Sequence, residues 1–234
     1  MYQDLTIGNK SFIKRFSHSK RFEFAIDLLS FSVNDNYLDY GTGDGYMLKM
    51  VERSKTAPSL IVGYEPTETQ YVQASFIFEG SMRPKIYNST NELCDEGYNK
   101  ISCLEVLEHL SDKHLVVALF NLYEILSKDG LLVISVPIET GIAGFGKNLI
   151  RLALRQAHDG TSFSSVFKSL FGLEVIRPDL DYISSHIGFN HKRLESLFSD
   201  AGFYIQNKLY SPFPALGGLA NSQIFFCLKK CRKF

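Results

Sequence analysis

The chain has 234 residues and a mass of 26.5 kDa, which is enough for one large domain with a complete hydrophobic core. Hydrophobic residues make up 45% of the sequence, and 25 basic and 25 acidic side chains give a formal net charge of zero. This composition excludes a disordered, collagen-like or fibrous chain, and it provides no overall positive charge for binding nucleic acid or acidic membranes.

Short apolar segments alternate with helical segments over the first 136 residues. In chain order the sequence predicts two amphipathic helical stretches within Ser11–Leu29, a strand at Asn36–Tyr40, a helix at Gly45–Ser54, a strand at Leu60–Tyr64, a helix at Glu68–Phe78, strands at Lys85–Tyr87 and Lys100–Leu104, a helix at Asp112–Ser127 and a strand at Leu131–Val136. Strands separated by helices are typical of a parallel sheet with helices on both faces.

The helical segments carry their own boundary and packing signals. Thr67 and Gln70 have the spacing of a capping box at the start of the helix Glu68–Phe78. Ser111 precedes the helix Asp112–Ser127 as a predicted cap. That helix is expected to bury one stripe of apolar residues, formed by Val116, Leu119, Leu122, Tyr123 and Leu126.

The carboxyl-terminal part departs from the alternation. Asn190 is a predicted cap for a helix that runs through Ser199. Two strands follow, at Phe203–Tyr210 and Gln223–Leu228, with no helix between them. They are therefore expected to form an antiparallel pair at the end of an otherwise parallel sheet.

Two regions fall outside a minimal α/β unit. Residues 139–186 form a connection too long for a compact domain, and we interpret them as a lid or substrate-binding insertion that contains a basic amphipathic helix at 147–157. Residues 1–34 form a helical cap with a basic run that includes Lys20 and Arg21. Such a run either grips an anionic acceptor or forms a solvated helix face, and we favour the solvated face. The whole chain, 1–234, is interpreted as one domain.

The most informative segment is the turn after the first predicted strand, Tyr37-Leu38-Asp39-Tyr40-Gly41-Thr42-Gly43-Asp44-Gly45. Alternate glycines at the carboxyl end of a strand let a ligand approach the backbone closely, although an ordinary tight turn has the same composition. A dinucleotide fingerprint needs a third glycine where this chain has Tyr46. The acids at Asp39 and Asp44 favour a cationic ligand such as S-adenosylmethionine over a diphosphate, which prefers a positive helix end.

Five segments, in this order, resemble class I S-adenosylmethionine-dependent methyltransferases of the type 11/12-like small-molecule group. They are LDYGTGDGY, VGYEP, ISCLEVLEHL, LSKDGLLVISVP and HIGFNHKRLESLFSDAGF, and the resemblance covers roughly residues 35–138 and 186–228. It implies a Rossmann-like, seven-stranded, mostly parallel sheet that ends in a carboxyl-terminal antiparallel hairpin. It also implies that S-adenosyl-L-methionine is the cofactor.

The resemblance assigns cofactor-binding roles at the ends of the strands. Glu65 follows the second strand, where a carboxylate accepts hydrogen bonds from both ribose hydroxyls, which agrees with the residue-based reading. The other implied cofactor residues are Asp39 for the loop or the ammonium group, Gly41, Thr42, Gly43 and Gly45 for the amino acid part, Pro66 beside the ribose, Asn88 and Ser89 near the adenine, and Glu105 at the methionine end.

The acceptor side rests on the run Glu105-x-x-Glu108-His109. His109 and Glu105 are the predicted catalytic residues, with His109 as a base or an orienting group for an oxygen acceptor on a small molecule or glycan. The run also resembles a divalent-metal site found in two branches of the family, the ubiquinone-pathway O-methyltransferases and the RNA-3′-end methyltransferases. In that alternative His186 is a further candidate ligand. We favour the metal-free reading; a protein that binds the cofactor without catalysis is the third alternative.

The remaining features concern location and partners. The cysteines Cys94, Cys103, Cys227 and Cys231 form no C-x-x-C pair and are expected to be reduced thiols. The amino terminus has no signal-peptide pattern, and the longest apolar run is too short to span a bilayer. We therefore expect a cytoplasmic protein with no transmembrane segment and no nucleic-acid partner; peripheral membrane contact and the oligomeric state stay open.

Overall fold

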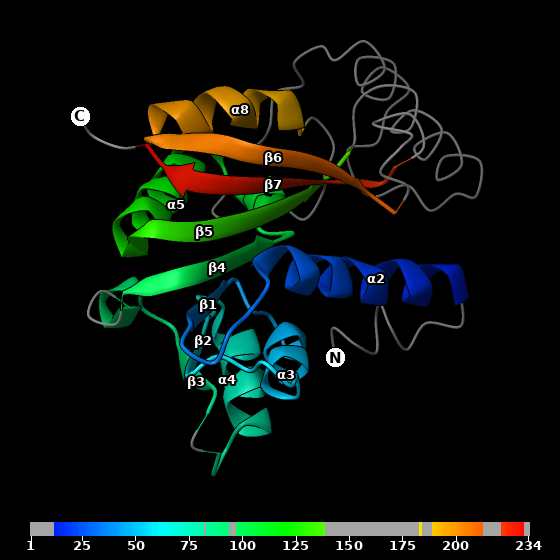
Figure 1. The fold of residues 1–234 in the computed structure, drawn as a ribbon, viewed down its shortest axis with the longest axis vertical. Helices are drawn as coiled ribbons and strands as arrows, with labels where there is room; N and C mark the ends of the chain where they lie inside the picture. Colours follow the sequence, from blue (N-terminus) through cyan, green and yellow to red (C-terminus); the bar gives the residue numbers. More distant parts are fainter. Residues whose placement is uncertain are drawn as a thin grey trace.

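The computed structural model describes residues 12–81, 83–93, 97–138, 183, 189–212 and 221–231. The predicted insertion at 139–186, with its helix at 147–157, lies outside these residues except for Ile183. Seven strands form one sheet in the order β3-β2-β1-β4-β5-β7-β6 (Figure 1). The strands are β1 (Asn36–Tyr40), β2 (Leu60–Tyr64), β3 (Lys85–Tyr87), β4 (Tyr98–Leu104), β5 (Leu126–Pro137), β6 (Phe203–Ser211) and β7 (Gln223–Lys230).

The sheet is mostly parallel, as predicted. The strands β3, β2, β1, β4 and β5 pair in parallel, whereas β7 pairs antiparallel with both β5 and β6. From β1 the chain builds one half of the sheet through β2 and β3, and it then returns to the other side of β1 with β4. This reversal between β1 and β4 is the point at which open α/β sheets bind ligands, at the carboxyl ends of the strands.

Helices cover both faces of the sheet. They are α2 (Phe12–Leu29), α3 (Tyr46–Glu52), α4 (Glu68–Ile77), α5 (Asp112–Ile125) and α8 (His191–Asp200), with short 3-10 turns at Thr90–Leu93 and Leu107–His109. Figure 1 shows α8 along β6 and α2 beside β4. The segment Ser11–Leu29, predicted as two helical stretches, contains a single helix.

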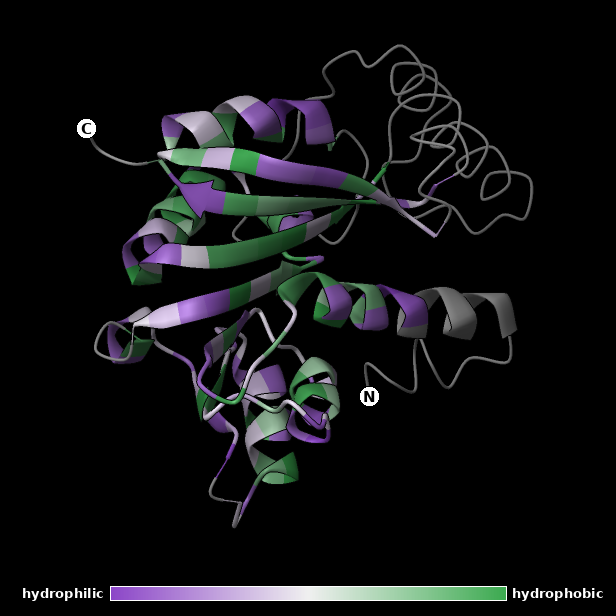
Figure 2. Ribbon diagram, in the orientation of Figure 1, coloured by the Kyte–Doolittle hydropathy of each residue, from purple (hydrophilic) through white to green (hydrophobic). Residues whose placement is uncertain are grey.

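Alternate residues of each central strand enter two different cores. In β5, Ile134 packs with α5 and α8 on one face, and Val133 packs with α2 and α3 on the other. The β7 residues Phe226 and Phe225 divide in the same way. Because both faces are covered, β5 and β7 are apolar over most of their length, whereas the edge strand β6 carries more polar residues (Figure 2).

The helix α5 buries Leu119 and Leu122 as predicted, but Val116 is not part of its buried stripe. Its buried residues are Leu115, Ala118, Leu119, Leu122 and Ile125, and Val116 is 55% exposed. The predicted cap at Ser111 makes no capping bond; its hydroxyl lies 2.9 Å from Nδ1 of His114. Strand β5 begins at Leu126, within the predicted helix Asp112–Ser127 and before the predicted strand start at Leu131.

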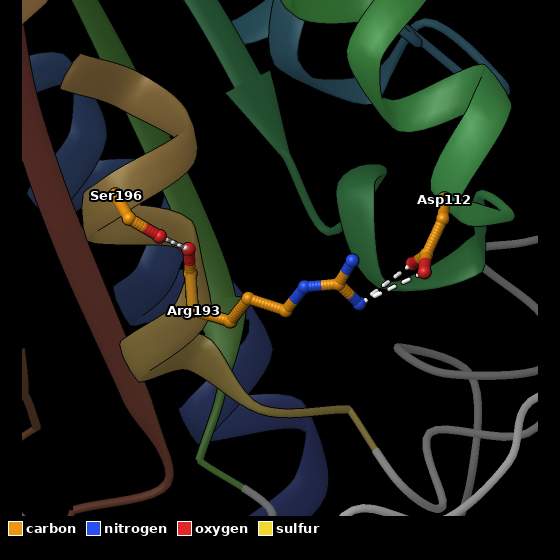
Figure 3. Close-up of polar contacts among 3 residues, drawn as sticks. All are labelled: Asp112, Arg193 and Ser196. Atoms are coloured by element: carbon orange, nitrogen blue, oxygen red, sulfur yellow. Dashed lines mark hydrogen bonds and ion pairs between the residues drawn. The ribbon is translucent and has the colours of Figure 1, made fainter. Parts of the chain in front are cut away.

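The helices α5 and α8 pack into the same core, and an ion pair joins their first turns. Asn190 caps α8 as predicted, since its side chain accepts a hydrogen bond from the Lys192 backbone N–H at 3.1 Å. Arg193 of α8 reaches Asp112 of α5 with an N···O distance of 2.9 Å (Figure 3). Both side chains are about half exposed, so this pair contributes at most about 1 kcal/mol to stability.

Candidate functional site

A cavity of about 170 Å³ opens at the carboxyl ends of β1 and β4, where the strand order reverses. Its walls come from the glycine turn after β1, the end of β2, the segment after β4 and the helix α2. The described lining residues are Arg21, Phe22, Asp39, Gly41, Thr42, Gly43, Asp44, Tyr46, Met47, Glu65, Pro66, Thr67, Gln70, Leu104, Glu105, Val106, His109 and Leu110.

The glycine turn is folded back against the end of β2. The backbone N–H groups of Gly41 and Thr42 both donate to the Tyr64 carbonyl, at 2.8 and 2.9 Å. Gly41 has a φ of 82°, and a Cβ there would lie 2.4 Å from a methyl group of Val106. Only glycine fits this position, because both the backbone conformation and the space exclude a side chain.

Glu65 joins the glycine turn to the start of α4. Its carboxylate accepts hydrogen bonds from the N–H groups of Gly43 and Thr67, both at 2.9 Å, and the residue is only 5% exposed. Thr67 is the N-cap residue of α4, but the predicted capping box is absent. The backbone N–H of Thr67 donates to Glu65, and the Thr67 side chain makes no capping bond. A carboxylate has about four lone-pair sites, so Glu65 keeps capacity for the hydroxyls of a ribose.

A buried chain of hydroxyl groups supports the turn from below. Asp39 of β1 lies opposite Ser102 of β4, whose hydroxyl donates to the Asp39 carboxylate at 2.6 Å. The Tyr37 hydroxyl lies 2.6 Å from Ser102 Oγ and donates to it, because the Ser102 proton is already engaged. Burial raises the pKa of Asp39 from 3.8 to about 6, and the negative charge of Glu65 contributes to this rise.

The helix α2 closes one side of the cavity with a cation. The Arg21 guanidinium forms an ion pair with Glu105 at 2.9 Å, and Arg21 is 5% exposed. Our interpretation of the basic amino-terminal run as a solvated face is therefore wrong for Arg21, although it holds for Lys20, which is exposed. Arg21 lies one helical turn before the fully buried Ala25, so both residues are on the buried face of α2.

The two predicted catalytic residues lie on the same side of the cavity. Glu105, directly after β4, has a φ of 57°, a conformation that non-glycine residues rarely adopt, and its N–H donates to the Ser135 carbonyl at 3.0 Å. His109 is joined to Ile183 at two points: its Nδ1 lies 2.8 Å from the Ile183 carbonyl, and its own carbonyl accepts the Ile183 N–H at 2.8 Å. A carbonyl only accepts, so Nδ1 carries the proton and the neutral ring has its lone pair on Nε2.

The other predicted site residues lie apart from the described cavity lining. Gly45 is the N-cap residue of α3, and Asn88 and Ser89 follow the end of β3. Glu108 is fully buried, and His186 lies outside the described residues. Within the part of the chain that the structure describes, no group of three or more His, Cys, Asp or Glu side chains is placed to hold a metal ion.

Comparison with known families identifies the fold and its chemistry. Residues 14–208 match the family model described as a methyltransferase domain. The chain belongs to this methyltransferase family. The match confirms the resemblance to class I S-adenosylmethionine-dependent methyltransferases, and the protein is an enzyme that uses S-adenosylmethionine. No curated protein matches the sequence.

Solved structures agree with this methyltransferase fold at low sequence identity. An S-adenosylmethionine-dependent methyltransferase from Clostridium acetobutylicum has a TM-score of 0.62 at 12% identity, over 99% of this chain and 96% of its own. Magnesium protoporphyrin IX methyltransferase from Synechocystis, solved with bound S-adenosylhomocysteine, has a TM-score of 0.58 at 13% identity, over 95% and 89%. The cyclopropane synthase MmaA2 from Mycobacterium tuberculosis has a TM-score of 0.61 at 12% identity, over 96% and 88%.

These neighbours differ widely in the molecules that their names record, so the shared fold leaves the acceptor of this methyltransferase undefined. Among the helices of the described ranges, none is both long enough and apolar enough to cross a bilayer.

Proposed function

We propose that this methyltransferase transfers the methyl group of S-adenosylmethionine to an oxygen atom of a small-molecule or glycan-type acceptor, with His109 as the base. The observation that carries the proposal is the position and tautomer of His109. Its ring lines the cavity on the same segment as Glu105, and the Ile183 carbonyl fixes the proton on Nδ1. Nε2 is therefore the atom that takes the proton from an acceptor hydroxyl.

The lining residues suit the cofactor in charge. Glu65 would hold the ribose, with Pro66 packed beside it, and the backbone from Gly41 to Gly43 would contact the amino acid part. Four carboxylates line the cavity, Asp39, Asp44, Glu65 and Glu105, and they favour a ligand that carries a sulfonium and an ammonium group. The expected contacts of Gly45, Asn88 and Ser89 with the loop and the adenine stay part of this proposal.

For methyl transfer, the protein mainly has to align the acceptor oxygen with the methyl group and remove the acceptor's proton. The sulfonium of the bound cofactor supplies an activated methyl group. The protein holds the acceptor oxygen in line with that group and excludes water. His109 contributes by accepting the hydroxyl proton at Nε2. General-base catalysis of this kind raises the reaction rate by roughly 10²- to 10⁴-fold.

One observation favours the metal-free reading over a metal-assisted one. Glu105, a ligand in the metal hypothesis, already forms an ion pair with Arg21 at 2.9 Å. A guanidinium at this distance competes with a divalent cation for the same carboxylate. Retention of activity after dialysis against a chelator would agree with this, whereas loss that Mg²⁺ or Mn²⁺ restores would favour the metal-assisted alternative.

The proposal is tested in two steps with the full chain. Titration calorimetry should show binding of S-adenosylmethionine and S-adenosylhomocysteine, and no binding of NAD as a dinucleotide control. Transfer of a radiolabelled methyl group should then be measured against hydroxylated sugars, glycolipids and phenols. Transfer confined to nitrogen or carbon acceptors would overturn the oxygen assignment, and cofactor binding without any turnover would favour a non-catalytic protein.

The location is also part of the proposal. The described cysteines Cys103, Cys227 and Cys231 are free thiols, and two of them are buried in β4 and β7. Free thiols agree with a reducing compartment, and we propose that the protein works in the cytoplasm.

A further inference from the structure

The ion pair between Arg21 and Glu105 is buried in the wall of the cavity. The exposed fractions of the two side chains are 6% and 16%, and their N···O distance is 2.9 Å. A buried ion pair is weak evidence for stability, because removing two charges from water costs about as much as their attraction returns. Glu105 also adopts a φ of 57°, and such strained residues concentrate at functional sites. Both observations suggest that the pair serves a ligand.

Arg21 is held firmly in its place. Its helix α2 is anchored in the core through Ala25 and Leu29, which have no exposed surface. The guanidinium carbon lies 5.2 Å from the centre of the Phe22 ring, and that ring packs on Tyr46 at 5.2 Å. Arg21 therefore presents its guanidinium group from a rigid wall and not from a mobile surface side chain.

The charges around the cavity are unequal. Four carboxylates line it, whereas Arg21 is the one Lys or Arg side chain among the described lining residues. S-adenosylmethionine carries two cationic groups and a single anionic group, its α-carboxylate. The carboxylates can pair with the cations, but among the described lining residues only Arg21 offers a permanent positive charge to the anion. Guanidinium also matches a carboxylate with two parallel hydrogen bonds.

We propose that Arg21 binds the α-carboxylate of the cofactor and that Glu105 pairs with its α-ammonium group, so that the two residues recognise the amino acid zwitterion. In the structure each side chain serves as the partner that the ligand later provides. This inference rests on the proposed cofactor site, and it makes Arg21 a residue that distinguishes the intact cofactor from shortened adenosyl compounds.

The test compares three ligands by titration calorimetry: S-adenosylmethionine, its decarboxylated form, which keeps the sulfonium and the amine, and 5′-methylthioadenosine, which lacks the whole amino acid part. Arg21→Ala should weaken the affinity for S-adenosylmethionine by roughly 10- to 100-fold, the range for a charge-assisted pair, and should change the affinities for the other two ligands by less than about threefold. Arg21→Lys should reduce the affinity for S-adenosylmethionine by an intermediate amount, because lysine keeps the positive charge but lacks the planar guanidinium group that forms two parallel hydrogen bonds. Glu105→Gln should weaken both amine-bearing ligands and spare 5′-methylthioadenosine.

Lys20→Ala is the matched control, since Lys20 is the preceding cation of α2 and is paired with Glu23 on the surface. It should leave all three affinities unchanged. Thermal unfolding of each variant checks the fold, and Arg21→Gln replaces Arg21→Ala if the latter does not fold. The inference would be overturned if the folded Arg21 variants lost affinity equally for all three ligands, or if they kept the wild-type affinity for S-adenosylmethionine. Failure of the wild-type protein to bind any of the three would instead overturn the proposed function.

Discussion

Replacing Glu65 should damage both the fold and the cofactor site, because its carboxylate joins two loops. In Glu65→Ala, the N–H groups of Gly43 and Thr67 lose the acceptor that each holds at 2.9 Å. A hydrogen bond to a charged group contributes about 1.5–3 kcal/mol, and two bonds to one carboxylate are not fully additive. We therefore expect the free energy of unfolding to fall by about 2–4 kcal/mol.

Glu65→Gln gives a graded version of the same experiment. The amide keeps one acceptor oxygen and turns a donor toward the second N–H group, so about half of the loss is expected, roughly 1–2 kcal/mol. Cofactor affinity should fall in both variants by about 1–3 kcal/mol, because the ribose loses a charged acceptor as well. Glu79→Ala, an exposed acid beyond the end of α4, serves as the matched control and should change neither quantity.

Urea unfolding followed by circular dichroism, with and without saturating S-adenosylhomocysteine, measures both effects in one series. The ligand should raise the urea midpoint of the wild-type protein more than that of either Glu65 variant. Reduced affinity with unchanged unfolding of the free protein would mean that Glu65 contacts the ligand but does not hold the loop. If neither quantity changed, the assignment of Glu65 would be refuted.

Three further predictions follow from the same cavity. Gly41→Ala should lose cofactor binding in calorimetry, because its Cβ would lie 2.4 Å from a Val106 methyl group. The nearest protein atom to a Cβ at Gly43 is 3.5 Å away, so in the free protein Gly43→Ala should cost only its φ strain, about 1 kcal/mol of stability, and any further effect should fall on cofactor binding. Since the folded-state pKa of Asp39 is raised from 3.8 to about 6, its contribution to stability is present below pH 4 and is lost as the pH rises to about 6; urea unfolding of wild type and Asp39→Asn should therefore diverge by up to about 3 kcal/mol over that interval. His109→Gln should lower the rate constant of methyl transfer by roughly 10²-fold or more and abolish its rise with pH, with little change in cofactor affinity; an unaltered pH profile would remove His109 from the role of base.

The sequence predicted the strands and helices in their chain order because each of them is marked by a local pattern. Apolar segments such as Leu60–Tyr64 and Leu131–Val136 must be strands buried on both faces, and the segments between them repeat at helical spacing. The glycine turn and Glu65 were equally accessible, since each directly follows a strand. Their convergence at one cavity follows from the parallel arrangement alone, which brings the carboxyl ends of neighbouring strands to one edge.

What the sequence did not predict depends on contacts between distant segments. Val116 was placed in the buried stripe of α5, but the structure shows that Leu115 and Ala118 take that role, a rotation of the helix face that helical spacing alone left undefined. The burial of Arg21 was missed because a basic residue on a helix is usually solvated. Its partner, Glu105, is 84 residues later in the chain, beyond the reach of any local pattern.

The carboxylates of the cavity have two opposing electrostatic effects: they attract the cationic groups of the ligand, and they destabilise the empty site. The carboxylates that suit a cationic ligand repel one another, as the effect of Glu65 on the pKa of Asp39 shows. The ion pair with Arg21 relieves this repulsion on one side, and the Ser102 hydroxyl relieves it beneath the glycine turn. A ligand that carries both charges completes the balance, because its cations meet the carboxylates and its anion meets Arg21. Selectivity for the intact cofactor then follows from the charges of the empty protein, before any contact with the acceptor.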